Sequence, residues 1–154
     1  MVSVTMISMG AGLFLCAMLV WLSWIDIKHG LLPDLLTLPL MWAGLLINIQ
    51  EVFTTLPDAV LGAAVGYGVL WFANLVYRWR AGQDGMGYGD FKLMAALGAW
   101  LGIGAVPWVL TGACVAGAIA ACVWRFAGSI KADHPFGPFL SAAGAAMMIK
   151  LFSS

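Results

Sequence analysis

The uncharged run VTMISMGAGLFLCAMLVWLSWI, residues 4–25, is long enough to form a helix that crosses a membrane. Such a helix needs roughly 20 mostly apolar residues to span the hydrocarbon core of a bilayer. In the chain as a whole, 154 residues long, 63% of the residues are hydrophobic and only 9% are charged. Soluble proteins carry about 25% charged residues, so this composition indicates an integral membrane protein.

Five further apolar segments follow this run, at residues 35–49, 58–77, 91–103, 105–123 and 137–152. Three of them, the second, fourth and sixth apolar segments of the chain, are shorter than a full span and lie next to Pro or Gly. Short segments of this kind are typical of helices that tilt or end inside a cavity. We therefore expect an all-α fold: a polytopic membrane bundle of about six transmembrane helices, some short or tilted, in a single domain covering residues 1–154.

The basic residues predict how this bundle is oriented. Six of the seven Lys and Arg residues fall on one side of it: Lys28, Arg78, Arg80, Lys92, Arg125 and Lys131. The loop NIQEVFTTLPD, residues 48–58, lies on the other side and contains acidic residues but no basic one. By the positive-inside rule the basic side is cytoplasmic, which places both termini outside. The seven acidic and seven basic residues balance, so a nucleic-acid partner is not expected. The apolar composition makes the lipid bilayer the expected surroundings of the chain.

Small residues recur at a spacing that favours close packing of helices. Gly62 and Gly66 are four residues apart, and so are Gly98 and Gly102. Glycines at this spacing allow two helix backbones to approach each other closely in a membrane. We expect these glycines to lie at helix–helix contacts.

The cysteines do not indicate a metal site. Cys16, Cys114 and Cys122 all lie inside apolar runs, and no two of them have the CxxC spacing. We interpret them as packing residues, and we expect neither a metal nor a cofactor.

Two aspartates stand at the predicted cytoplasmic ends of apolar segments. Asp26 ends the first segment, and Asp90 begins the fourth. Ionisable groups near membrane depth are costly, so they are candidates for a functional role. If the bundle brings the two carboxyl groups together in a partly dry site, they cannot easily both ionise, and one remains protonated beside its partner. A pair that shares a proton in this way can activate water and protonate a leaving amine, as in aspartyl proteases.

Each aspartate also has a simpler interpretation. Asp26 alone could be a solvated residue at the membrane interface, and Asp90 alone could be a helix N-cap. The three glycines Gly85, Gly87 and Gly89 argue against a simple cap at Asp90, because they permit a positive φ and close backbone approach. We expect this loop to give a substrate backbone access to Asp90.

Three stretches of the chain resemble the type IV prepilin peptidases, membrane aspartyl proteases of the GxGD type. GMGYGDFKLMAALGAWLG (residues 85–102) resembles their second signature and DIKHGLLPDLLTLPLMWAGLL (residues 26–46) their first. PFGPFLSAAG (residues 135–144) is similar to their C-terminal Pro-Phe-Gly-Pro element. The three matches occur in the order of the family, and together they are far more specific than a lone Gly-x-Gly-Asp.

The resemblance implies an endopeptidase that removes the basic leader from type IV prepilins or pseudopilins. Cleavage in the family follows a glycine and takes place at the cytoplasmic face of the bacterial inner membrane, which would place both termini of this chain in the periplasm. Position by position, the resemblance makes Asp26 and Asp90 the catalytic residues.

Other polar residues near the signatures are assigned weaker roles. Asp34 follows Pro33 and precedes an apolar run, so we expect it to N-cap the second helix, with a catalytic role as the alternative. Lys92 could bind substrate or shift the carboxyl pKa values, but setting the orientation in the membrane is the simpler role. Tyr88 could contact substrate or pack in the turn.

The resemblance also leaves alternatives open. Many family members carry an N-terminal extension with paired CxxC motifs that is associated with zinc and with methylation of the new N-terminus. The chain begins at the first helix of the protease core, as a short member or a fragment, so methyltransferase activity is not expected. The alternative functions are a non-catalytic scaffold subunit of a pilus or secretion apparatus, and a small transporter whose aspartates couple protons.

Overall fold

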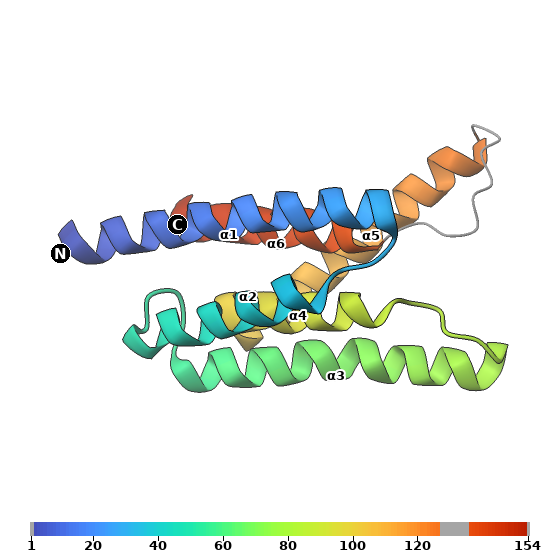
Figure 1. The fold of residues 1–154 in the computed structure, drawn as a ribbon, viewed down its shortest axis with the longest axis horizontal. Helices are drawn as coiled ribbons and strands as arrows, with labels where there is room; N and C mark the ends of the chain where they lie inside the picture. Colours follow the sequence, from blue (N-terminus) through green and yellow to red (C-terminus); the bar gives the residue numbers. More distant parts are fainter. Residues whose placement is uncertain (1, 127–135, 154) are drawn as a thin grey trace.

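A computed structural model describes residues 2–126 and 136–153, and in these residues the fold is entirely helical (Figure 1). The helices are α1 (Val2–His29), α2 (Asp34–Ile47), α3 (Leu56–Ala81), α4 (Tyr88–Leu101), α5 (Val106–Phe126) and α6 (Gly137–Ser153). Two short 3₁₀ turns, η1 (Asn48–Gln50) and η2 (Ile103–Ala105), follow α2 and α4. The predicted all-α bundle is confirmed, and the six predicted segments fall on the six helices.

Three of the helices are long and apolar enough to cross a membrane, at Met6–His29, Leu56–Ala81 and Ile103–Phe126. The other three are short, as the sequence predicted. With 14 residues, α4 is about 21 Å long, less than the ~30 Å of a hydrocarbon core. The chain is a multi-pass membrane protein in which long and short helices alternate.

The helices alternate in direction and form two groups. Figure 1 shows α1 beside α6, while α4 lies between α2 and α3, and α5 slants from the end of α4 toward α6. Both termini lie at one end of the bundle, and the α1–α2 connection and the start of α4 lie at the other end. This alternation brings the end of α1 to the same end of the bundle as the start of α4.

The core of the bundle is α4. Every residue from Leu93 to Leu101 is buried, and so are Asp90 and Phe91. A helix that is apolar on all sides is covered either by other helices or by lipid. The helices α2, α3 and α6 all pack against α4. The short length of the fourth segment therefore reflects a central position, where neighbouring helices rather than lipid cover its surface.

The glycines with four-residue spacing lie at the contact between α3 and α4. A Cβ atom at Gly62 would collide with the carbonyl oxygen of Gly98, and a Cβ at Gly98 would collide with that of Gly62. At Gly66 a Cβ would lie 2.9 Å from the Met94 carbonyl oxygen. The two backbones thus touch directly, which confirms the predicted close packing.

We expect Gly62→Ala to destabilise the protein, because the obstacle is a backbone carbonyl that cannot rotate away. Overpacking of this kind costs about 1–3 kcal/mol, and it should appear as a lower melting temperature of the protein in detergent. Gly68→Ala is the matched control on α3, since a Cβ there meets nothing within 4 Å. Equal melting temperatures for the two variants would contradict this account of the α3–α4 contact.

Asn48 is a buried polar residue at the end of the bundle that holds the termini. Its Nδ2 donates to the carbonyl oxygens of Ala99 and Trp100, at 2.9 and 3.1 Å. Its Oδ1 accepts from the backbone N–H groups of Phe53 and Thr54, at 3.0 and 3.3 Å. One side chain therefore ties the α2–α3 connection to the last turn of α4, which the sequence analysis did not predict.

Candidate active site

Asp26 lies in the last turn of α1, and its exposed fraction is only 5%. The chain leaves this helix at Gly30, whose φ is +63° and whose N–H donates to the Asp26 carbonyl oxygen at 2.8 Å. A left-handed residue at this point ends the helix and turns the chain toward α2. Because only 5% of Asp26 is exposed, the interpretation of this residue as a solvated interfacial residue is wrong.

The Asp26 carboxylate is held by the start of α6. The backbone N–H of Gly137, the first residue of α6, donates to Asp26 Oδ2 at 3.1 Å. The first N–H groups of a helix have no partner within the helix, and they lie at its positive end. A Cβ at Gly137 would lie 2.5 Å from the same Asp26 oxygen, so this approach requires glycine.

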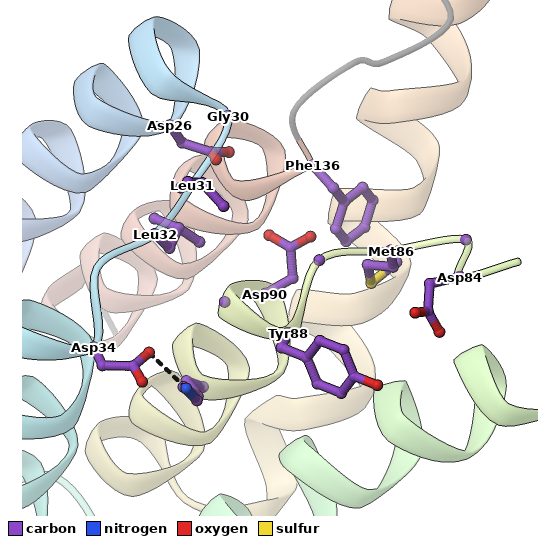
Figure 2. A pocket seen from close by; sticks show the side chains of 14 residues that line it. Asp26, Gly30, Leu31, Leu32, Asp34, Asp84, Met86, Tyr88, Asp90 and Phe136 are labelled. Carbon is purple, nitrogen blue, oxygen red and sulfur yellow. Dashed lines mark hydrogen bonds and ion pairs between the residues drawn. The ribbon is translucent and has the colours of Figure 1, made fainter.

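Asp90 is the third residue of α4 and is 6% exposed. The N-cap of this helix is Gly87, and the Asp90 N–H donates to the Gly87 carbonyl oxygen at 3.1 Å. The interpretation of Asp90 as a helix N-cap is thus wrong by three positions. Figure 2 shows the Asp26 and Asp90 carboxyl groups turned toward the same space, with Phe136 beside it.

Asp90 lies outside the three candidate membrane spans. Burial of its carboxyl group, together with the negative charge of Asp26, raises the pKa of Asp90 to about 7. Near neutral pH the site can therefore hold one carboxylate and one protonated carboxyl group.

The two aspartates line a cavity of about 750 Å³ (Figure 2), which lies at the end of the bundle opposite the termini (Figure 1). All eight residues that the sequence analysis singled out line it: Asp26, Asp34, Gly85, Gly87, Tyr88, Gly89, Asp90 and Lys92. The remaining lining residues are Gly30, Leu31, Leu32, Asp84, Met86 and Phe136. The tertiary structure thus brings three segments that are far apart in the chain to one site: residues 26–34, residues 84–92 and Phe136.

The glycines before Asp90 show one of the two properties expected of them, close approach, but not the other, a positive φ. None of Gly85, Gly87 and Gly89 has a positive φ; in the described residues the glycines that do are Gly30, Gly82 and Gly102. Two of the three instead allow close contact, because a Cβ at Gly85 or Gly89 would lie 2.6 Å from the Tyr77 ring or the Leu32 Cβ. At Gly87 a Cβ would meet only Asp90 Oδ2, at 4.0 Å, so open space adjoins this glycine and Asp90.

Asp34 forms an ion pair and does not cap its helix. The N-cap of α2 is Pro33, and no side chain makes a capping hydrogen bond there, so the predicted N-cap role is wrong. Asp34 Oδ1 instead pairs with Lys92 Nζ at 2.5 Å (dashed line in Figure 2). The Asp34 side chain is 58% exposed, so it lies at the rim of the cavity, while Asp26 lies at its buried end.

Tyr88 both lines the cavity and packs in the turn. It is 49% exposed, and its ring lies edge-on to Phe91 with centroids 5.5 Å apart. The two roles that the sequence left open for Tyr88 are therefore compatible.

Two residues that hydrogen-bond to parts of this site, Gly137 and Asn74, were not predicted from the sequence. Asn74 is buried in α3 and bonds to the loop before Asp90. A polar amide inside an apolar segment was the available signal, since such a group needs a partner. Of the residues used in the sequence analysis, Lys131 and Pro135 lie outside the described residues.

In the part of the chain that the structure describes, no three His, Cys, Asp or Glu side chains gather as metal ligands. The polar groups at the buried end of the cavity are two carboxyl groups. Their chemistry is proton transfer to and from a water or a substrate.

Comparison with known proteins connects this site to a family. The sequence pattern of the type IV leader peptidase family matches residues 13–122. Curated relatives named prepilin leader peptidase/N-methyltransferase are 49% identical over 136 residues in Burkholderia pseudomallei strain 1026b and 48% over 134 residues in Neisseria gonorrhoeae. A relative of the same name in Aeromonas hydrophila is 50% identical over 137 residues.

These matches cover 87%, 86% and 87% of this chain but only 44%, 46% and 47% of the three relatives. The chain thus spans about half the length of the curated relatives it matches. No solved structure matches it significantly.

Proposed function

The chain belongs to the type IV leader peptidase family, and from this membership we propose that it is a membrane aspartyl endopeptidase. Its substrates are prepilins or pseudopilins, from which it removes the leader peptide by cleavage after a glycine. The single observation that carries the proposal is that Asp26 and Asp90, both nearly buried, line one cavity.

The proposed mechanism uses the two carboxyl groups as a pair that shares one proton. The carboxylate takes a proton from a water molecule, whose oxygen attacks the carbonyl carbon of the scissile peptide. The protonated partner donates its proton to the carbonyl oxygen, which gives a neutral tetrahedral intermediate. When the C–N bond breaks, the pair gives its proton to the leaving nitrogen and takes one from a hydroxyl group of the intermediate, whose oxygen becomes the carbonyl oxygen of the product acid, so the pair again holds one proton.

The surroundings of the pair support this chemistry. The Gly137 N–H fixes one Asp26 oxygen, so the carboxylate has a defined orientation. Asp90 projects from the first turn of α4, a helix packed on several sides by its neighbours. Two groups held on rigid helices keep a water molecule and a peptide aligned more accurately than groups on loops.

The location that we propose for this site is the cytoplasmic face of the bacterial inner membrane, with both termini in the periplasm. It rests on the basic residues Lys28, Arg78, Arg80 and Lys92, which occur near the cavity end of the bundle. A basic leader remains on this side when the apolar helix of a pilin inserts. The substrate and the catalytic pair would then meet at one membrane surface.

Two other functions remain as alternatives with distinct consequences. A scaffold subunit would use the aspartates only to stabilise helix ends, and a transporter would need them near the centre of the membrane. The cavity favours the peptidase, because a scaffold has no need for two buried carboxyl groups beside open space.

The direct test is cleavage of a synthetic prepilin by the purified protein in lipid vesicles, with the products identified by mass spectrometry. We expect one cut, directly after the glycine that precedes the apolar helix. The rate should fall as the pH rises above about 7, because Asp90 then loses the proton that the pair must share. Binding without cleavage would indicate the scaffold instead, and a rate that keeps rising to pH 9 would exclude the shared proton.

A further inference from the structure

Asn74 lies in α3 and is 7% exposed. Its Oδ1 accepts the backbone N–H of Gly85 at 2.9 Å, and its Nδ2 donates to Asp84 Oδ1 at 3.1 Å. The donor and the acceptor of the amide thus bond to two consecutive residues of the loop between α3 and α4. A buried amide without these partners would be costly, so the bonds and the burial support each other.

The loop that Asn74 holds forms one wall of the cavity and leads into the first turn of α4. Asp84, Gly85, Met86 and Gly87 all line the cavity, and Asp90 follows three residues after Gly87. Gly85 rests on the Tyr77 ring, where a Cβ would lie only 2.6 Å away. The path of the loop is therefore determined by its contacts with Asn74 and Tyr77 of α3.

A second contact from α3 reaches the same carboxylate more weakly. Arg78 lies 3.9 Å from Asp84 Oδ1, but both side chains are about half exposed. Exposed ion pairs contribute little, typically about 0–1 kcal/mol. The buried amide of Asn74 is the stronger constraint on the loop.

We propose that Asn74 is a positioning residue, which holds the loop Gly82–Gly87 in place and thereby places Asp90 opposite Asp26. This inference rests on the proposed peptidase function. Asn74 itself takes no part in proton transfer, and it acts on the reaction through the two hydrogen bonds to Asp84 and Gly85.

The arrangement allows a test by exchanging the two polar groups. In Asn74→Asp the amide donor is lost, and at a pH high enough to ionise the new carboxyl group two carboxylates face each other, so the loop should move under these conditions. Displacement of a reacting group by about 1 Å can cost up to 10²-fold in rate, and we expect kcat to fall at least about tenfold. In the double variant Asn74→Asp/Asp84→Asn, the new amide at position 84 can donate to the new carboxylate at position 74. The hydrogen bond is then restored in reverse, and most of the lost kcat should return.

Asn48→Ala is the matched control, because it also removes a buried amide with several bonds but lies at the other end of the bundle. It should lower the melting temperature and leave kcat of the folded protein unchanged. A purely structural role for Asn74 predicts the same pattern for Asn74→Asp, which would overturn the proposal. The proposal also fails if the double variant is no more active than Asn74→Asp.

A second measurement does not depend on cleavage. The Gly85 N–H should exchange with solvent more rapidly in Asn74→Leu than in the unaltered protein, because its acceptor is removed. Unchanged exchange would refute the positioning role even if the protein cleaved prepilin. If the unaltered protein cleaves nothing but Asn74→Leu accelerates this exchange, the peptidase function fails while Asn74 still holds the loop.

Discussion

Asp26→Asn and Asp90→Asn should each lower the rate of prepilin cleavage at least about 10³-fold, the largest effect expected of any single substitution in this chain. An amide has nearly the shape of the carboxyl group but can neither take a proton from water nor donate one to the leaving group. Both residues are buried in one cavity, so a water molecule cannot take the place of a missing carboxyl group unless the site rearranges. The measurement is the initial rate of leader removal in vesicles, corrected for the amount of folded protein.

Two other aspartates serve as controls for this experiment. Asp58→Asn makes the same chemical change at the opposite end of the bundle, where Asp58 is only partly buried and Asn can still accept from Thr55. Asp34→Asn removes the partner of Lys92 at the rim of the cavity, so we expect a modest loss of activity. If Asp34→Asn abolishes cleavage while Asp26→Asn does not, the first member of the pair has been misassigned. Normal processing by both Asp26→Asn and Asp90→Asn would reject the aspartyl mechanism.

Gly137→Ala should lower kcat by about 10²-fold, the second largest effect, because the added methyl group occupies the place of the Asp26 carboxylate. A Cβ at this position would lie 2.5 Å from Asp26 Oδ2 and 3.1 Å from Asp26 Cγ. Either the carboxyl group rotates away or the start of α6 shifts, and the Gly137 N–H then no longer orients Asp26. Single-turnover cleavage by the detergent-solubilised variant measures this loss.

Gly10→Ala is the control for added side-chain volume, because a Cβ at Gly10 of α1 meets nothing within 4 Å. It should keep its full activity. A loss of kcat in Gly137→Ala with little change in melting temperature would assign the effect to the site. Gly137→Ala with unaltered kcat would show that the contact between Asp26 and α6 is not needed for the reaction.

The sequence could predict the helices because their signal is local. Inside a bilayer the backbone N–H and C=O groups of a segment must form hydrogen bonds with one another, and a helix satisfies all of them within the segment. An apolar run of sufficient length therefore predicts a helix. The six predicted segments therefore coincide with α1 to α6. The signatures around Asp26 and Asp90 were also recognisable in the sequence, and every residue to which they assigned a role in the site lines the cavity.

Predictions about the physical role of single residues were less reliable, because those roles depend on distant partners. Asp34 was expected to cap α2, yet it pairs with Lys92, 58 positions away in the chain. The glycines before Asp90 were expected to permit a positive φ and to give a substrate backbone room, yet none has a positive φ, and Gly85 and Gly89 make close contacts with Tyr77 and Leu32 of the chain itself. A local motif shows where small residues are needed but not which neighbour requires them.

The amino-acid sequence by itself determined the membrane-bundle fold class and the helix order, and it indicated the two aspartates as candidate catalytic residues, since hydrophobic length, charge and family motifs act over short stretches of chain. Only the tertiary structure decided that the Gly137 N–H holds Asp26, that Asn74 holds the loop before Asp90, and that α4 is surrounded by other helices. Each of these contacts joins residues on different helices. The direction and distance of such a contact follow from how the helices pack, and packing is a property of the whole bundle rather than of any one segment.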